Sequence, residues 1–103
     1  MAQDIPTVVM NIERKHFAAI LAQPKRKRIE YRDMSPYWRR RLQGLGTKRF
    51  KLRLLNGMRP PVPEATMIVE RLVRNYHFQQ FELHLGRIVK IENWDRQAEQ
   101  PAS

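Results

Sequence analysis

The chain has 103 residues, and its 20 Lys and Arg outnumber its 10 Asp and Glu to give a formal net charge of +10. This length fits one domain with a modest core and leaves little volume for a deep substrate cavity. The absence of cysteine excludes disulfides, cysteine-ligated metal sites and a thiol nucleophile. A hydrophobic share of 42% is typical of a folded domain and not of a disordered polycation.

The sequence predicts neither a membrane-spanning helix nor a secretory signal. No apolar run approaches the roughly 20 residues that a membrane-spanning helix needs. The first residues, from Met1 to Pro6, lack the basic start and the apolar stretch of a secretory signal. We therefore expect a cytoplasmic protein that does not contact membranes.

The first elements in the chain are a predicted strand and a predicted helix. Residues Thr7–Ile12 are rich in β-branched side chains, which favours a strand, and Asn11 is the expected cap of the next element. The spacing over Arg14–Ala22 predicts a helix that ends before Pro24. Its apolar face is formed by Phe17, Ile20 and Leu21.

A second strand and a second helix follow. Residues Lys27–Asp33 alternate, which predicts a strand with Glu30 and Arg32 on one face and Lys27 on the other. Ser35-Pro36 is typical of a helix start, with a capping serine and proline at the first helical position. The apolar face of this helix consists of Trp38, Leu42 and Leu45.

The second half of the chain is dominated by predicted strands. Residues Lys48–Leu55 alternate with Phe50, Leu52 and Leu54 on the inward face. Asn56-Gly57 indicates a turn, and the prolines of Met58–Glu64 indicate a loop. Further strands are expected over Thr66–Val73, Phe78–Leu85 and Arg87–Ile91, the last two either separate or joined as one bent strand at Gly86.

These elements predict an α+β fold: a small, mostly antiparallel β-barrel of about five to six strands with two short flanking helices. A barrel is favoured because closure removes exposed strand edges. We expect a single domain over residues 1–94, followed by a polar, flexible tail over residues 95–103.

The positive charge is concentrated in one part of the sequence. Residues 25–53 hold 12 of the 20 basic side chains and only two acidic ones, whereas basic and acidic residues balance in the rest of the chain. A dense local positive field lowers the free energy of a bound polyanion. The alternative is that the basic surface is solvated and has no partner. An anionic membrane is a weaker candidate for the partner, because the segment has no broad apolar face to insert.

We expect this segment to bind RNA, either single-stranded or structured. Tyr37 lies beside three arginines and is a candidate for stacking on a base, whereas Trp38 lies on the apolar face of its helix and is expected in the core. Double-stranded DNA is a weaker candidate, because neither helix carries a set of base-reading side chains. The predicted nucleic-acid-binding residues are Lys27, Arg28, Arg32, Tyr37, Arg39, Arg40, Arg41, Lys48, Lys51 and Arg53.

Three residues are candidates for acid–base catalysis: Lys27, Glu30 and Glu70. Glu70 lies in an otherwise apolar run, where a carboxylate must be paired or exposed. A carboxylate beside a lysine can also shuttle protons in a hydrolase. Glu30 has an alternative role, an ion pair with Arg32 that supports the barrel. The histidines lack metal-ligand spacing and no glycine-rich phosphate loop is present, so we expect neither a metal nor a cofactor.

The segment from Phe17 to Arg32 resembles the signature of the ASCH domain family, a short helix ending in Gly-x-Lys-x-x-Glu-x-Arg. Lys27, Glu30 and Arg32 hold the Lys, Glu and Arg positions, while Lys25 stands where the family has glycine. Three further stretches are similar to a branch of small ASCH proteins that has a Pro-Tyr-Trp-x-x-Arg-Leu extension, an Asn-Gly turn and a Leu-Gly-Lys-Ile ending. They are residues 36–42, 55–57 and 81–89.

This resemblance implies a PUA-like β-barrel with a cleft lined by the signature residues. It also implies a link to RNA, either as a binding module or as a small enzyme acting on RNA or nucleosides. One branch of the family hydrolyses an acetylated cytidine amide with a Lys, a Thr and a Glu. Lys27 matches that Lys, Glu30 stands at the position of the Thr, and Glu70 is the counterpart of the Glu. Other members are similar to ribonucleases.

Three functional hypotheses follow. The first is an RNA-binding protein that uses its basic surface for phosphates and a polar cleft for a base. The second is a small hydrolase, either a ribonuclease or an acetylcytidine-type amidohydrolase, that uses Lys27 with Glu30 or Glu70. The third is a protein-interaction module of a phage or mobile element that engages an acidic host protein. The sequence does not predict the oligomeric state.

Overall fold

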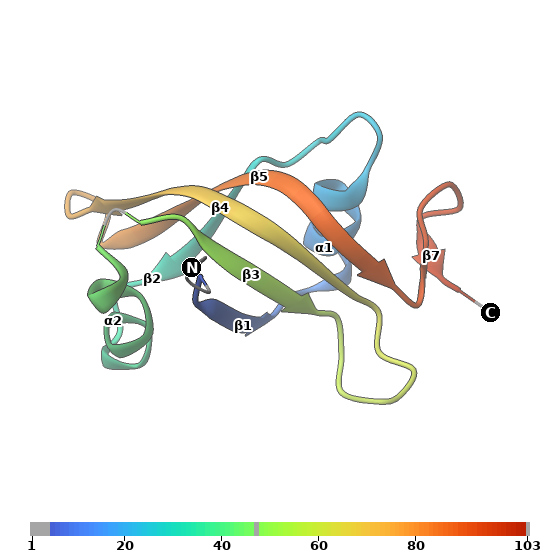
Figure 1. The fold of residues 1–103 in the computed structure, drawn as a ribbon, viewed down its shortest axis with the longest axis horizontal. Coiled ribbons are helices and arrows are strands. Elements are labelled where there is room, and N and C mark those ends of the chain that lie inside the picture. The colour runs from blue at the N-terminus through green and yellow to red at the C-terminus, as the bar shows by residue number, and fades with distance from the viewer. Residues whose placement is uncertain (1–4, 47, 103) are drawn as a thin grey trace, which may run out of the picture.

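A curled sheet forms the frame of the fold. The computed structural model describes residues 5–46 and 48–102, and within them one sheet of five strands has the order β1-β3-β4-β5-β2. β1 pairs with β3 in parallel, and the other neighbours are antiparallel, so the sheet is mixed and curls into a half-barrel (Figure 1). The strands are β1 (Thr7–Asn11), β2 (Ile29–Asp33), β3 (Phe50–Leu55), β4 (Glu64–Asn75) and β5 (Gln80–Glu92).

Two short helices lie at opposite ends of the curled sheet (Figure 1). They are α1 (Arg14–Leu21) and α2 (Pro36–Leu42), and α2 continues into a 3-10 turn, η1 (Gln43–Leu45). The predicted start of α2 is confirmed: the Ser35 hydroxyl accepts a hydrogen bond from the Trp38 amide at 3.4 Å. The predicted cap of α1 is wrong. Asn11 is the last residue of β1, and Glu13 occupies the N-cap position without a side-chain hydrogen bond.

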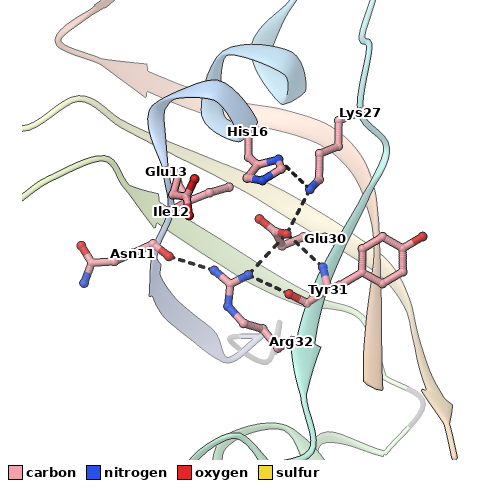
Figure 2. Close-up of a pocket in the computed structure, with 8 residues that line it drawn as sticks. All are labelled: Asn11, Ile12, Glu13, His16, Lys27, Glu30, Tyr31 and Arg32. Carbon is pink, nitrogen blue, oxygen red and sulfur yellow. Dashed lines mark hydrogen bonds and ion pairs between the residues drawn. The ribbon is translucent and has the colours of Figure 1, made fainter. Parts of the chain in front are cut away.

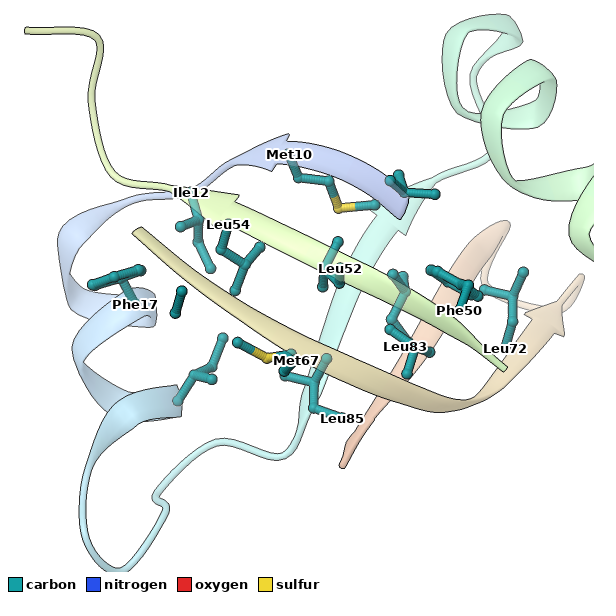
Figure 3. Packing of buried hydrophobic residues seen from close by; sticks show 14 of the residues in the cluster. Met10, Ile12, Phe17, Phe50, Leu52, Leu54, Met67, Leu72, Leu83 and Leu85 are labelled. Atoms are coloured by element: carbon teal, nitrogen blue, oxygen red, sulfur yellow. The ribbon is translucent and has the colours of Figure 1, made fainter. Parts of the chain in front are cut away.

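The core fills the concave side of the sheet (Figure 3). Alternation along β3 directs Phe50, Leu52 and Leu54 inward, where all three are fully buried. α1 contributes its predicted apolar face, and α2 contributes Leu42. Trp38 packs against this core while remaining partly exposed, as its position on the apolar face of α2 predicts.

Irregular pairing bends the long β4–β5 hairpin. The register shifts at three points between Thr66 and Arg71, and such bulges increase the local bend and twist of a sheet. Gly86 lies opposite the last bulge, where a Cβ atom would be 2.6 Å from the Glu70 Cγ atom. A side chain at position 86 would therefore clash with Glu70. The apolar segments predicted around Gly86 form one bent strand, β5.

The polar C-terminal segment folds back onto α1. Residues Trp94–Asp95 (β6) and Gln100–Pro101 (β7) pair as a small antiparallel hairpin. The buried Trp94 ring meets the Phe17 ring edge-on at 5.0 Å, and Arg96 donates a hydrogen bond to the Leu21 carbonyl at 2.7 Å. Glu99 pairs with Arg26, which lowers the pKa of the Glu99 carboxyl. The expected flexible tail is thus a hydrogen-bonded hairpin over residues 94–102.

The α+β class, the curled barrel-like sheet and the two short helices agree with the sequence-based prediction. Element bounds differ by up to two residues: β2 and β3 each begin two residues later than expected, and β4 is longer at both ends. The loop between β3 and β4 is correspondingly two residues shorter than predicted, because Glu64 and Ala65 belong to β4.

Trp94 ties the hairpin to the core, so its removal is expected to destabilise the whole domain. We expect Trp94→Ala to lower the free energy of unfolding by about 3–5 kcal/mol, as large aromatic truncations in cores do. Phe78→Ala is the matched control, because Phe78 is 67% exposed and should cost less than about 0.5 kcal/mol. Urea denaturation followed by circular dichroism measures both values. Equal, small losses in the two variants would show that the hairpin does not contribute to the core.

Candidate functional site

A polar cleft opens where the two edge strands of the half-barrel approach each other. It has a volume of about 450 Å³ and lies between the end of β1, the first turn of α1 and strand β2 (Figure 2). Its lining contains two acidic and three basic side chains beside one exposed aromatic ring. The lining residues are Asn11, Ile12, Glu13, His16, Lys27, Glu30, Tyr31 and Arg32.

Glu30 is the centre of the cleft. It pairs with Leu83 across the β2–β5 ladder, so its side chain points toward the interior of the barrel, and the residue is only 4% exposed. Oε1 accepts a hydrogen bond from the Tyr31 amide at 2.9 Å. Oε2 is buried and has no hydrogen-bond donor among the described residues. A buried carboxylate is costly unless it is paired and hydrogen-bonded, so this half-satisfied group marks a candidate site.

Two cations hold the Glu30 carboxylate from opposite sides (Figure 2). The Lys27 Nζ and Arg32 Nη1 atoms each lie 3.3 Å from Oε1. Both side chains are less than one-fifth exposed, so water screens these pairs less than it screens surface pairs. The three signature positions therefore converge in one cleft.

The loop before β2 brings Lys27 to Glu30. A regular strand over Lys27–Asp33 predicts Lys27 on the opposite face, but β2 begins only at Ile29. The amides of Arg26 and Lys27 both donate to the Ala19 carbonyl, at 3.0 and 3.2 Å, which turns the chain around the end of α1. Lys27 thus approaches the carboxylate from outside the strand, where the alternation of side chains does not apply.

Lys25 anchors the same loop to β5. Its ammonium donates to the Gly86 carbonyl at 2.6 Å, at the bend of that strand. Partial burial lowers the pKa of Lys25, and the nearby charges of Arg28 and Arg96 lower it further. The Lys25 side chain therefore ties the loop before β2 to the bend of β5.

His16 is a member of the site that the sequence did not predict. Its Nδ1 atom lies 3.1 Å from Lys27 Nζ. A protonated lysine has only donors, so His16 then accepts at Nδ1 and carries its proton on Nε2. Nothing in the spacing of the histidines signals this contact, because it depends on how α1 packs beside the loop before β2.

Arg32 joins the two edge strands. Its Nη2 atom donates to the Asn11 carbonyl of β1 at 2.8 Å, and Nη1 donates to the Tyr31 carbonyl of β2 at 2.8 Å. The guanidinium also lies 5.5 Å from the centre of the Trp38 ring of α2. One side chain thus links both walls of the cleft and the second helix.

Glu70 lies outside the cleft, contrary to its predicted partnership with Lys27. It falls at the β4 bulge, is exposed, and pairs through Oε2 with Arg49 Nε at 3.0 Å. Alternation along β4 is the physical reason: Ala65, Met67 and Val69 are buried on the inner face, so Glu70 falls on the outer face of the sheet. Glu70 therefore does not line the cleft that contains Lys27.

The predicted phosphate-binding residues occupy more than one face. Arg40 and Arg41 are exposed on α2, while Arg39 donates to the Met34 carbonyl at 2.7 Å. Lys48 and Lys51 border a groove of about 690 Å³ that also includes Arg49 and Arg87, on the outer face of the sheet. Arg53 pairs with Glu64 at 2.7 Å, and Arg28 is exposed beside the loop that carries Lys27. Tyr37 lies on α2 under the Arg41 guanidinium.

The lining of the cleft is mainly polar and charged. Over residues 5–46 and 48–102, no group of His, Asp and Glu side chains is arranged to hold a metal ion. In the same part of the chain, no helix has the length and apolarity to cross a membrane. No protein-family model matches the chain, and comparisons with curated proteins and with solved structures find no significant similarity.

The linkage through Arg32 predicts a measurable stability contribution. Arg32→Met keeps the apolar stem but removes the donors to Asn11, Tyr31 and Glu30. We expect the free energy of unfolding to fall by about 1–3 kcal/mol, because the buried Glu30 carboxylate loses one of its cations and two backbone carbonyls lose a charged donor. Arg28→Met is the matched control on an exposed position of the same segment, with an expected change below about 0.5 kcal/mol. Urea denaturation compares the two, and an equal effect of both substitutions would contradict the linkage.

Proposed function

We propose that this protein is an ASCH-like, PUA-like RNA-binding domain whose cleft receives an unpaired base. The observation that carries the proposal is the Glu30 carboxylate, which is buried between two cations and whose Oε2 has no donor among the described residues. The convergence of Lys27, Glu30 and Arg32 supports the resemblance to the ASCH signature, which implies a cleft lined by these positions.

The composition of the cleft suits the edge of a nucleobase. A carboxylate accepts hydrogen bonds from the exocyclic amino groups of cytosine, adenine or guanine, and lysine and arginine donate to ring nitrogens and carbonyl oxygens. The Tyr31 ring is 43% exposed beside the cleft and offers a stacking surface. The volume of the cleft lies within the usual range of small-ligand sites, about 300–1,000 Å³.

The exposed cations supply the sequence-independent part of the binding. Arg40 and Arg41 are exposed on α2, and Arg28 is exposed next to the loop that carries Lys27. A single strand with one base in the cleft would bring its neighbouring phosphates within reach of these side chains. Lys48 and Lys51 lie on the outer face and would contact only a longer or folded RNA.

Replacing the Glu30 carboxylate by an amide should weaken the binding of bases that carry an amino group. We expect Glu30→Gln to bind oligo(C) about tenfold or more weakly than the parent chain, since one mismatched base contact costs about 1–3 kcal/mol. Binding of oligo(U), which has no amino group, should change little. Fluorescence anisotropy with labelled oligonucleotides measures both affinities.

The control is Glu92→Gln, which removes an exposed carboxylate paired with Lys90 and should not alter the preference for oligo(C). The same titrations at several salt concentrations test the phosphate contacts, each of which contributes a slope of about 0.7 on a logarithmic plot for single strands. A salt-independent affinity, or an equal loss for oligo(C) and oligo(U) in Glu30→Gln, would remove the basis of the proposal.

Hydrolysis of an acylated nucleoside is the second candidate, because the Lys27 amine contacts Glu30 and His16 in an open cleft. In such a reaction water adds its hydroxyl to the acyl carbon, the carbon–nitrogen bond breaks, and a proton reaches the leaving nitrogen. Glu30 would take the proton from water, and Lys27 would return one to the leaving group. A ribonuclease would use the same two groups on a phosphodiester.

Incubation with N4-acetylcytidine and with RNA tests this second candidate. If the cleft is catalytic, Lys27→Ala should slow acetate release or RNA cleavage by about 100-fold or more, the usual contribution of a positioned acid or base. Lys90→Ala, an exposed lysine on β5, should leave the rate unchanged. Substrates that stay intact with the parent chain would leave RNA binding as the only function of the cleft.

A further inference from the structure

The strand β1 has one paired edge and one open edge. The Pro6 carbonyl accepts from the Lys51 amide at 2.9 Å, and the Ile12 amide donates to the Leu55 carbonyl at 3.0 Å. Backbone N–H and C=O groups of successive residues in a strand point to alternate sides, so those of residues 6, 8, 10 and 12 point toward β3. The backbone N–H and C=O groups of Thr7, Val9 and Asn11 therefore point to the open edge. The hydrogen bond from Arg32 to the Asn11 carbonyl agrees with this alternation.

At Thr7 and Val9, the open edge is accessible and has no feature that blocks pairing with another strand. Within residues 5–46 and 48–102, no partner contacts the backbone N–H and C=O groups of Thr7 and Val9 on this side. Natural sheets usually blunt such edges with charged side chains or proline, because a free edge is a template for another strand. Thr7, Val9 and Asn11 are uncharged, and Val9 is 44% exposed.

A groove runs along this edge. It has a volume of about 580 Å³, and its second wall comes from α2 and η1, through Tyr37, Arg41 and Leu45. The Tyr37 side chain is 47% exposed, and the Arg41 guanidinium lies 3.5 Å from the centre of its ring. Arg41 has no acidic partner among the described residues. The groove thus combines a strand edge, an apolar wall and one positive charge.

We propose that this groove binds an extended, acidic peptide segment of a partner protein, which adds to the open edge of β1 as a further strand. The edge offers alternating donors and acceptors, which another peptide backbone matches. A phosphate backbone presents mainly acceptors and would face the carbonyls of Thr7 and Val9 unfavourably. A second copy of this chain is disfavoured because each copy carries a net charge of +10.

Val9→Pro tests the edge without touching the β1–β3 ladder. The Val9 N–H faces the open edge, and proline is tolerated at an edge position whose N–H makes no ladder hydrogen bond. The probes are two eight-residue peptides, one alternating valine with glutamate and the other alternating valine with lysine. Their binding to the isotope-labelled chain is followed by amide chemical shifts. We expect binding of the glutamate peptide only, a loss of about tenfold or more in Val9→Pro, and less than about threefold change in Val9→Ala.

Two further measurements make the test independent of the folding of Val9→Pro. Glutamate peptides methylated on one or the other set of alternate amides should differ strongly in affinity, because only one set faces β1. Slow amide exchange should appear at Thr7 and Val9 when the peptide binds, and Arg41→Glu should shift the preference toward the lysine peptide. Equal affinity of both methylated peptides, no binding at millimolar concentration, or oligo(U) shifting the same amides in place of the peptide would overturn the proposal.

This inference does not rest on RNA binding by the cleft. Glu30 does not line the groove. Glu92→Gln, a change at a residue outside both the cleft and the groove, should leave the affinity for the glutamate peptide unchanged, and a loss of peptide binding in that variant would contradict the proposal. RNA binding and peptide binding can therefore fail separately.

Discussion

The guanidinium of Arg32 is the contact on which the rest of the site depends. The sheet has two edge strands, β1 and β2, that no backbone ladder joins. Arg32 spans them with hydrogen bonds to the Asn11 and Tyr31 carbonyls and also lies 3.3 Å from the Glu30 carboxylate. The Arg32 side chain therefore bridges the gap between β1 and β2 at one point, and the gap stays open on both sides of this contact. One opening is the cleft around Glu30, and the other is the groove beside β1.

This arrangement explains how a small domain can hold a buried charge. Burying a carboxylate is tolerated when cations and donors surround it, and Glu30 has Lys27, Arg32 and the Tyr31 amide on one oxygen. The second oxygen has no hydrogen-bond donor among the residues that the structure describes. A fully satisfied ion pair in the barrel wall would only support the fold. Glu30 differs from such a pair because its carboxylate also lines the cleft.

Local patterns in the sequence predicted most of the elements and little of the site geometry. Alternation identified the inward residues of β3, and the Ser35-Pro36 start of α2 follows from capping chemistry, because both depend on neighbours in the chain. The position of Lys27 depends on hydrogen bonds to Ala19 and on the Lys25–Gly86 contact, which no periodicity encodes. The pairing of Glu70 with Lys27 was not found because Glu70 alternates with the buried Ala65, Met67 and Val69 and so lies on the outer face of β4, away from the cleft. The hairpin over residues 94–102 was not predicted because this segment is polar apart from Trp94, and the burial of Trp94 depends on a contact with Phe17, which is distant in the sequence.

The contact between Trp94 and Phe17 has a consequence for how the cleft is assembled. Phe17 and His16 are adjacent on α1, so the C-terminal hairpin fixes the helix that forms one wall of the cleft. A substitution in the hairpin can therefore alter the position of His16 from a distance, although the residues of the hairpin are not among those that line the cleft.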